Sequence, residues 1–338
     1  MKRILPYSLC ILLGVFTTGA AQGILPNLGG QRAGISSLQF LKIGVGARGP
    51  GMGESAVAVV NDVSALFWNP AAAVLNDQNG VMFAHSEWLV DMKHDFLGVT
   101  YHITPGDLVG FSVISLRTDD MPVTTELQPF GNGAYFHYSD LAIGLTYSKK
   151  MTAQFSFGTT VRYIEEDLAD VKIRTALFDF GTFYTTGLGS LRIAVAVANF
   201  GGDVAPIGTA PQVDGSAVSS FQSFSPPTVF KLGFAFEPLQ TDQHRITMTV
   251  QLNHPNDNAE DMRFGVEYAW NNWLMLRGGL KRIVGESWFA KSQQTADDFS
   301  FGFGVLIPLS FTTATFDYSY TNFNELGSVQ RVSCGLTY

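Results

Sequence analysis

The side chains that could carry out catalysis or bind a metal are few and scattered in this chain. The six histidines are His85, His94, His102, His137, His244 and His254. They form no spaced pair on one predicted element, as a zinc site needs, and the sequence has no Gly-x-Ser-x-Gly motif of a serine hydrolase. We therefore predict no catalytic residue, no bound metal, no cofactor and no enzyme activity.

Two segments have the composition of a ligand site. The stretch His254–Asn258 brings oxygen-bearing side chains together and could bind a calcium ion weakly, but a turn between two strands favours the same residue types. The glycine-rich stretch Gly44–Gly53 lacks the Gly-Lys-Ser/Thr ending of a phosphate loop. We interpret both segments as structural.

Most of the chain follows a period of two. From Phe299 to Ile307, Phe, Val and Ile alternate with Ser and Gly, as in a strand between lipid and a polar lumen. A charge near the midplane of the lipid face costs a few kcal/mol, so we assign the charged positions of this register to the lumen. They are Arg162, Asp179, Arg192, Lys231, Arg263, Glu267, Arg277, Asp317 and Arg331.

Segments of this kind occur fourteen times from Gly80 onward, each near the ten residues that a tilted membrane strand needs. They are 80–89, 94–103, 107–117, 139–148, 152–164, 173–185, 189–199, 227–237, 244–253, 261–270, 273–282, 298–307, 311–320 and 328–338. We predict an all-β fold: a transmembrane antiparallel β-barrel of about 14 strands.

The connections between these segments alternate in length, as a barrel with both termini in the periplasm requires. The short turns are Thr104–Gly106, Lys149–Met151, Thr186–Leu188, Pro238–Gln243, Asn271–Asn272 and Pro308–Ser310. The longer, outer connections are Thr118–Tyr138, Glu165–Lys172, Phe200–Pro226, His254–Glu260, Ile283–Asp297 and Thr321–Gly327, and only the first outer loop, Val90–Lys93, is short. A soluble β-sandwich could also alternate its loops, but it needs a more charged exterior.

The two ends of the chain agree with an outer-membrane location. Lys2 and Arg3, an apolar run and small residues up to Ala21 predict a signal peptide over residues 1–21. At the other end the last strand finishes in an aromatic residue, and Leu336 and Tyr338 resemble the signal by which the barrel-assembly machinery recognises its substrates. We expect contact with outer-membrane lipid and with that machinery.

Composition excludes two further classes of protein. Removing Lys2 and Arg3 takes the formal charge from −8 to −10, so the chain has no basic surface for nucleic acid. Only 15% of the residues are charged and 27 are Phe, yet no stretch after the signal has the length of a membrane helix. These features favour a membrane barrel, assigned to residues 80–338.

Residues 22–79, between the signal peptide and the barrel, differ from the strand segments in composition and lack their period of two. Gly51 and Gly53 lie in a run of small residues, and Trp68, Asn69, Pro70 and Ala71 follow a second apolar stretch. Small residues allow close backbone approach, and Asn-Pro begins a turn. We predict a compact plug, or hatch.

This segment resembles the opening of the PorV/PorQ family of outer-membrane proteins. The likeness rests on Gly44–Ala73 and is supported by Lys231–Glu237, His254–Glu260, Asp317–Tyr320 and Leu326–Arg331, so it runs across nearly the whole chain after the signal. Gly49-Pro50 departs from the family, which commonly has small residues there. The resemblance implies a fold similar to FadL-type fatty-acid channels, with the hatch inside the barrel.

The resemblance also implies a function. The best-known member of the PorV/PorQ family serves type IX secretion. It receives secreted proteins by their C-terminal domain and passes them from the translocon to the surface attachment machinery. On that hypothesis the long loops Thr118–Tyr138 and Phe200–Pro226 contact the partners. The alternative is a FadL-like channel for hydrophobic or amphipathic small molecules, which needs an apolar path through the lumen. The small, polar and charged face that we predict for the lumen argues against that path.

Overall fold

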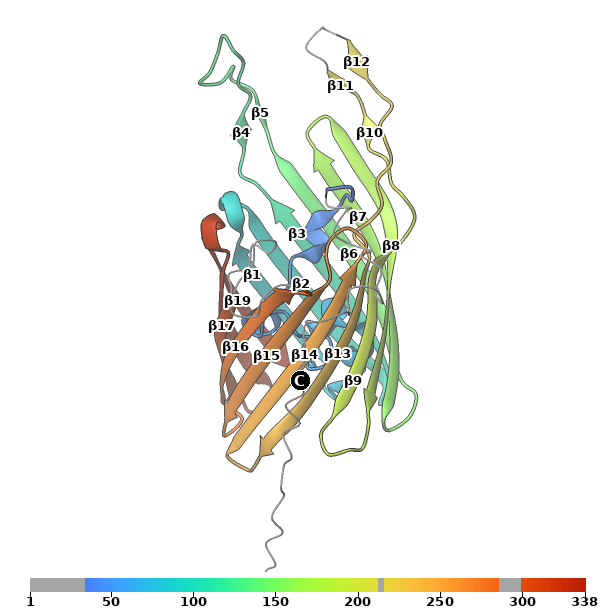
Figure 1. Cartoon of the computed structure of the whole chain (residues 1–338), viewed down its shortest axis with the longest axis vertical. Coiled ribbons are helices and arrows are strands. Elements are labelled where there is room, and N and C mark those ends of the chain that lie inside the picture. Colours follow the sequence, from blue (N-terminus) through green and yellow to red (C-terminus); the bar gives the residue numbers. More distant parts are fainter. Residues whose placement is uncertain (1–33, 212–215, 286–298) are drawn as a thin grey trace, which may run out of the picture.

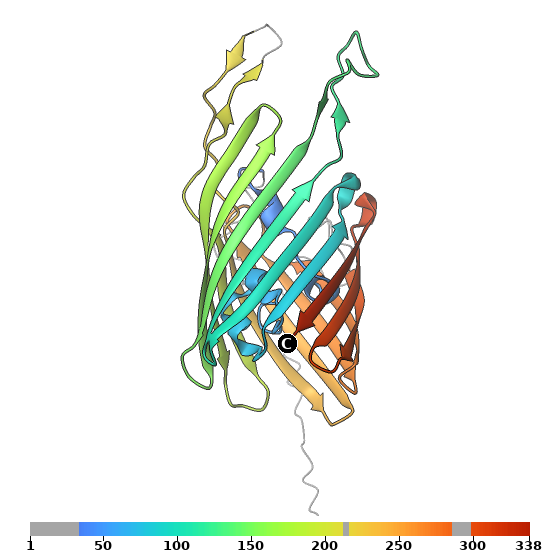
Figure 2. The same ribbon diagram turned by 180° about the vertical axis from the view of Figure 1, so that it is seen from behind.

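The computed structural model describes residues 34–211, 216–285 and 299–338, and the predicted signal peptide lies outside this part. Its main feature is a barrel of fourteen long antiparallel strands, which confirms the predicted fold class (Figures 1 and 2). The strands are β1 (Gly80–Glu87), β2 (Lys93–Thr104), β3 (Asp107–Arg117), β6 (Tyr138–Lys150), β7 (Phe155–Leu168), β8 (Val171–Thr185), β9 (Arg192–Phe200), β13 (Val229–Gln240), β14 (His244–Pro255), β15 (Asp261–Trp270), β16 (Leu274–Ile283), β17 (Phe299–Pro308), β18 (Thr313–Asn322) and β19 (Ser328–Thr337).

The barrel closes where the first strand meets the last. β1 pairs with β2 on one side and with β19 on the other, in a register that sets Gly80 opposite Thr337. Figure 2 shows these strands side by side. Every long strand therefore has a partner on both sides, which removes the free edges that a sheet could not leave in lipid.

The period of two divides the side chains between the two faces of the wall. In β17, Phe301 is 49% exposed on the outside, whereas Ser300 is 5% exposed on the inside. The same division holds between Leu336, which points outward, and Arg331, which is buried within. The wall thus presents apolar side chains outward and small or polar ones inward, as lipid and a filled lumen demand.

Within the described residues, no helix combines the length and the apolar character that crossing a membrane would take.

The N-terminal segment lies inside the barrel and carries short helices, in agreement with the predicted hatch (Figure 1). The helices are η1 (Gln39–Lys42), α1 (Arg48–Gly51), α2 (Ala65–Trp68) and η2 (Pro70–Leu75). η2 begins where Pro70 occupies a first-turn position that needs no N–H, and the Asn69 side chain caps it by accepting the N–H of Ala71. Pro50 is buried within α1, so the departure from the family leaves a helical turn.

Several strand ends differ from the prediction. β7 begins at Phe155 rather than at residue 152, because the Thr152 hydroxyl accepts the N–H groups of Gln154 and Phe155 and closes a turn. The predicted outer loop Glu165–Lys172 is wrong: β7 and β8 continue to a two-residue turn, in which Ala169 has a φ of 62°. This hairpin places charged side chains outward, as a sheet above the lipid can do.

Two long connections extend beyond the rim at one end of the barrel (Figure 1). The first carries β4 (Met121–Pro122) paired with β5 (Tyr135–Phe136). The second carries β10 (Ile207–Gly208), β11 (Ala210–Pro211) and β12 (Ala217–Val218). Two smaller turns at the same rim hold η3 (Leu89–Asp91) and η4 (Asn324–Leu326).

Candidate functional site

Two hollows lie on opposite sides of the hatch. The outer cavity, of about 330 Å³, lies at the strand ends next to the long connections, and hatch residues Glu54, Phe67 and Trp68 line it. The opposite cavity, of about 610 Å³, lies at the strand ends next to the short turns. The two share no lining residue, so the hatch stands between them.

Asn69, at the centre of the predicted hatch motif, is fully buried and bonded to both the hatch and the wall. Its Nδ2 donates to the carbonyl of Val57 (3.1 Å) and to that of Thr182 on β8 (3.2 Å), and its Oδ1 accepts the N–H of Ala71 (3.0 Å). The carbonyl of Ala71 in turn accepts the hydroxyl of Ser156 on β7 (2.7 Å). An amide that uses both its donor and its acceptor in this way fixes η2 against β7 and β8.

The small residues of the motif permit the hatch backbone to touch the wall. A Cβ added to Gly53, whose φ is +65°, would lie 2.7 Å from the backbone nitrogen of Leu280 on β16. Gly51 has looser surroundings, with Ser319 at 3.4 Å and Gly302 at 3.5 Å from such an atom. Gly53 therefore marks the closest approach of the two glycines.

Trp68 holds the two halves of the hatch together. Its ring is 2% exposed, and its Nε1 donates to the carbonyl of Val45 at 3.2 Å. A Cβ on Gly44 or Gly49 would come within 2.8 Å of this ring, so both positions leave room for it. Pro70, two residues on, lies against Gly158 of β7, where a Cβ would sit 2.3 Å from its carbonyl carbon.

The charges predicted for the lumen all lie inside the barrel, and most are paired. Arg162 binds Asp179 at 2.6 Å between β7 and β8, and Arg277 binds both Glu267 (2.7 Å) and Asp317 (2.6 Å). Charges buried in this way need such partners, because an unpaired charge is costly to remove from water.

Two further lumen arginines bind other partners. Arg263 binds Asp261 at 2.6 Å and also Glu54 of the hatch. Arg331 donates to the hydroxyl of Thr321 at 2.8 Å and lies 5.2 Å from the ring centre of Trp88.

The hatch contributes charged residues that the sequence does not single out, among them Arg48 and Glu54. Arg48 donates two parallel hydrogen bonds of 3.0 Å to Glu267 of β15, and Glu54 forms an ion pair with Arg263. Burial disfavours the charged guanidinium, but Glu267 and Asp62 outweigh it and raise the pKa of Arg48 above its ordinary value. A charge in an otherwise small and apolar segment is the signal that could have identified both residues.

The stretch His254–Asn258, considered for calcium, binds the N-terminal segment instead. The Asp257 carboxylate accepts hydrogen bonds from Ser36, from Gln39 at 2.8 Å and from the Lys42 ammonium at 2.9 Å. Burial opposes its charge, but these partners outweigh that effect and lower the pKa of Asp257. The described residues contain no cluster of three or more His, Cys, Asp or Glu side chains that could hold a metal.

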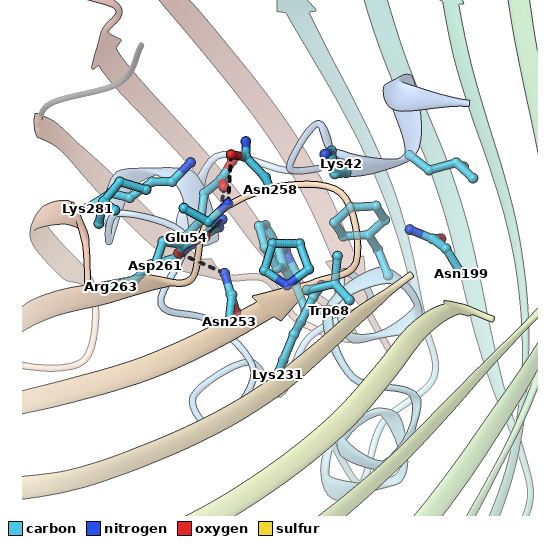
Figure 3. Close-up of a pocket in the computed structure, with 16 residues that line it drawn as sticks. Lys42, Glu54, Trp68, Asn199, Lys231, Asn253, Asn258, Asp261, Arg263 and Lys281 are labelled. Carbon is cyan, nitrogen blue, oxygen red and sulfur yellow. Dashed lines mark hydrogen bonds and ion pairs between the residues drawn. The ribbon is translucent and has the colours of Figure 1, made fainter. Parts of the chain in front are cut away.

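The outer cavity is lined by charged, polar and apolar side chains (Figure 3). Lys231 of β13 points into it with its ammonium over the ring of Trp68, while Glu54, Asp261 and Arg263 form one ion-paired group. The apolar part of the lining is Leu41, Phe67, Val229, Pro255 and Ile283. A cavity of this size with a few polar groups can hold a small ligand or a side chain of a partner.

The C-terminal end of the last strand carries the residues predicted as an assembly signal. Leu336 is 44% and Tyr338 57% exposed on the lipid side. Tyr338 exchanges two backbone hydrogen bonds with Asn79, of 3.0 and 3.1 Å, which fixes the end of β19 at the start of β1. Their role in assembly stays a prediction.

The barrel is similar to several solved outer-membrane proteins. It matches the Pseudomonas putida toluene transporter TodX with a TM-score of 0.56 and 12% identity over 90% of this chain and 98% of that one. The Ralstonia pickettii toluene transporter TbuX matches with a TM-score of 0.55 and 14% identity over 87% of this chain and 97% of that one. A Pseudomonas aeruginosa FadL homologue matches with a TM-score of 0.50 and 14% identity over 87% of this chain and 98% of that one. At these identities the likeness shows the fold.

Sequence comparison identifies the family. A search among curated proteins found no match. The profile of the family described as type IX secretion system protein PorV matches residues 28–255, which cover the hatch and the first nine long strands. That family is a component of a secretion system and not an enzyme. The chain is therefore an outer-membrane β-barrel that belongs to the PorV family of type IX secretion system proteins.

Proposed function

We propose that this barrel binds secreted proteins through their C-terminal domain and passes them from the type IX translocon to the surface attachment machinery. The family match supports an association with that secretion system. The observation that carries the proposal is the position of the two long connections, which extend from one rim of a barrel whose lumen the hatch occupies. Partners that cannot pass through the lumen must be bound at the rim.

The first of these connections has the features of a contact surface. At the tip of the β4–β5 hairpin, Leu127 is 95% and Phe130 is 99% exposed. Exposed apolar side chains on a projecting hairpin are typical of protein-binding sites, because burial against a partner removes them from water. We assign cargo and translocon contacts to this hairpin and to the 200–226 connection.

The difference in length between the connections at the two rims also indicates how the barrel is oriented in the membrane. The long connections face outward, and the short turns face the periplasm, as is usual for barrels of the outer membrane. Tyr338 and Asn79 lie at the rim of the short turns, because the neighbouring Thr337 pairs with Thr313, the first residue after such a turn. The C-terminus and the entry into β1 therefore face the periplasm in this orientation. In this orientation Leu336 and Tyr338 are available to the barrel-assembly machinery during insertion.

A pull-down of the tagged protein from its native outer membrane tests the proposal, with mass spectrometry of the proteins that co-purify. We expect a very large translocon barrel and surface proteins that share a C-terminal domain. Recovery of the barrel alone, with bound lipid, contradicts it. A matched strain that lacks residues 123–134, the tip of the β4–β5 hairpin, should lose the cargo while keeping the barrel in the membrane.

A second candidate function is a channel for hydrophobic or amphipathic small molecules. It is favoured by the similarity to solved transporters and by the apolar part of the outer cavity, such as Leu41, Val229 and Ile283. The ion pairs that hold the hatch argue against it, because a through path requires them to break. Uptake of long-chain fatty acid by liposomes that contain the protein, faster than by empty liposomes, would favour the channel.

A further inference from the structure

Lys231 is a buried cation in an unusual setting. It projects inward from β13, is 9% exposed, and lines the outer cavity. Its ammonium lies 5.5 Å from the ring centre of Phe67 and 5.6 Å from that of Trp68 (Figure 3). The aromatic faces stabilise the positive charge and hold it in place at the floor of the cavity.

Two other cations at this cavity are held in ion pairs, and a third, Lys281, also has an interaction of its own, but Lys231 is not paired. Lys42 binds Asp257, and Arg263 binds Glu54 and Asp261. Lys231 forms no ion pair or hydrogen bond with any residue in the ranges that the structure describes. An ammonium has three N–H donors, and aromatic faces replace neither water nor an oxygen acceptor, so this group retains the capacity to bind an anion.

We propose that the outer cavity binds a single carboxylate carried on an apolar or aromatic group, with Lys231 as its counter-ion. The cavity, of about 330 Å³, lies at the small end of the range for ligand pockets. Leu41, Val229, Pro255 and Ile283 supply an apolar lining for the group that carries the carboxylate.

The charge of the surroundings favours a carboxylate over a phosphate. Glu54 and Asp261 also line the cavity, and because these two acids share the single cation Arg263, this group carries one surplus negative charge. A second negative charge on the ligand would be repelled by these two acids, whereas one negative charge is matched by the one ammonium that lacks a partner. The same chemistry occurs in a free organic acid and at the C-terminus of a polypeptide.

The cavity can be reached from the side of the long connections. Its lining comes from the ends of β9, β13, β14, β15 and β16 that adjoin the outer connections, and from η1 and α2 of the hatch. This binding does not depend on the cargo function, so it extends the proposed function without resting on it.

Binding to the purified barrel in lipid nanodiscs tests the proposal by isothermal titration calorimetry. One pair of probes is 3-phenylpropionate and 3-phenylpropionamide, which differ in charge but not in shape. The second pair is the peptide N-acetyl-Gly-Gly-Phe with a free C-terminus and the same peptide as an amide. We expect both acids to bind and both amides to bind about 10- to 100-fold more weakly, because a charge-assisted hydrogen bond is lost.

Variants locate the site. Lys231→Met should lower the affinity for the acids about 10- to 100-fold and leave the amides unchanged. Lys93→Met is the matched control, because Lys93 lies at the outer rim and binds the exposed Asp119. The electrophoretic shift of the barrel on heating verifies that each variant is folded.

The outcomes are decisive. Tighter binding of the peptide acid than of 3-phenylpropionate supports the site and assigns it to a chain terminus, and the reverse order supports the site and assigns it to a free organic acid. Equal binding of acids and amides to the unaltered barrel overturns the proposal, whatever the variants do. Unchanged binding of both acids to folded Lys231→Met overturns it as well.

Discussion

The contact between the hatch and β16 gives the sharpest quantitative prediction. Gly279 of β16 faces the hatch, and a Cβ placed there would lie 2.0 Å from the nitrogen of Gly53 and 2.2 Å from the carbonyl carbon of Met52. Both are backbone atoms, so no side chain can turn away. Gly279→Ala must displace this part of the hatch and weaken the bond from the Gly53 N–H to Ser300, now 2.9 Å long.

Overpacking of this kind costs about 1–3 kcal/mol, and the weakened hydrogen bond adds about 1 kcal/mol, so we expect a loss of about 2–4 kcal/mol in the free energy of unfolding. Gly278→Ala is the matched control: the neighbouring residue faces outward, and its added methyl would have no atom within 4 Å. Urea titration of the barrel in lipid vesicles, followed by Trp fluorescence, measures both variants. Stabilities of Gly279→Ala and Gly278→Ala within 0.5 kcal/mol, roughly the scatter of neutral surface substitutions, would refute the close packing of the hatch on β16.

Arg48→Met leaves Glu267 with only Arg277 and should destabilise the hatch by about 2 kcal/mol, seen as faster hydrogen exchange in the hatch with the barrel strands unchanged. Asp257 has a lowered pKa, so its stabilising effect is complete above the ordinary pKa of about 3.9 and is lost as the pH falls below that value. The melting temperature of the unaltered protein should therefore fall in this acidic range, and that of Asp257→Asn should fall by a smaller amount. Deletion of residues 123–134 should leave the melting temperature within about 2 °C and abolish cargo binding in the pull-down, and retained cargo would exclude the hairpin as the contact.

The strands could be predicted because lipid imposes a period of two that needs no knowledge of partners. The stretch from Phe299 to Ile307 shows this, and β17 spans Phe299–Pro308. The tip of the β7–β8 hairpin could not be predicted, because charged side chains such as Glu165 and Lys172 face outward there and the apolar signal ends. For this reason the sequence pattern of a polar strand extension resembles that of a loop.

The inward direction of the charges could also be predicted, but their partners could not. The cost of a charge in lipid fixed Lys231 and Arg263 inward. Which acid each one meets depends on where the aperiodic hatch folds, and Glu54 reaches Arg263 across more than 200 positions of sequence. The absence of an acid beside Lys231 among the described residues emerges only in three dimensions.

A locked hatch tests most directly the central claim that this barrel works at its rim, with the hatch in place. The hydroxyls of Ser55 in the hatch and Thr249 on β14 lie 3.1 Å apart, close enough for a disulfide between Ser55→Cys and Thr249→Cys in a Cys334→Ser background. The measurement is the affinity of the oxidised and reduced barrel for the C-terminal domain of a secreted protein. We predict equal affinities in the two states. Loss of binding on oxidation, restored by reduction, would contradict the account.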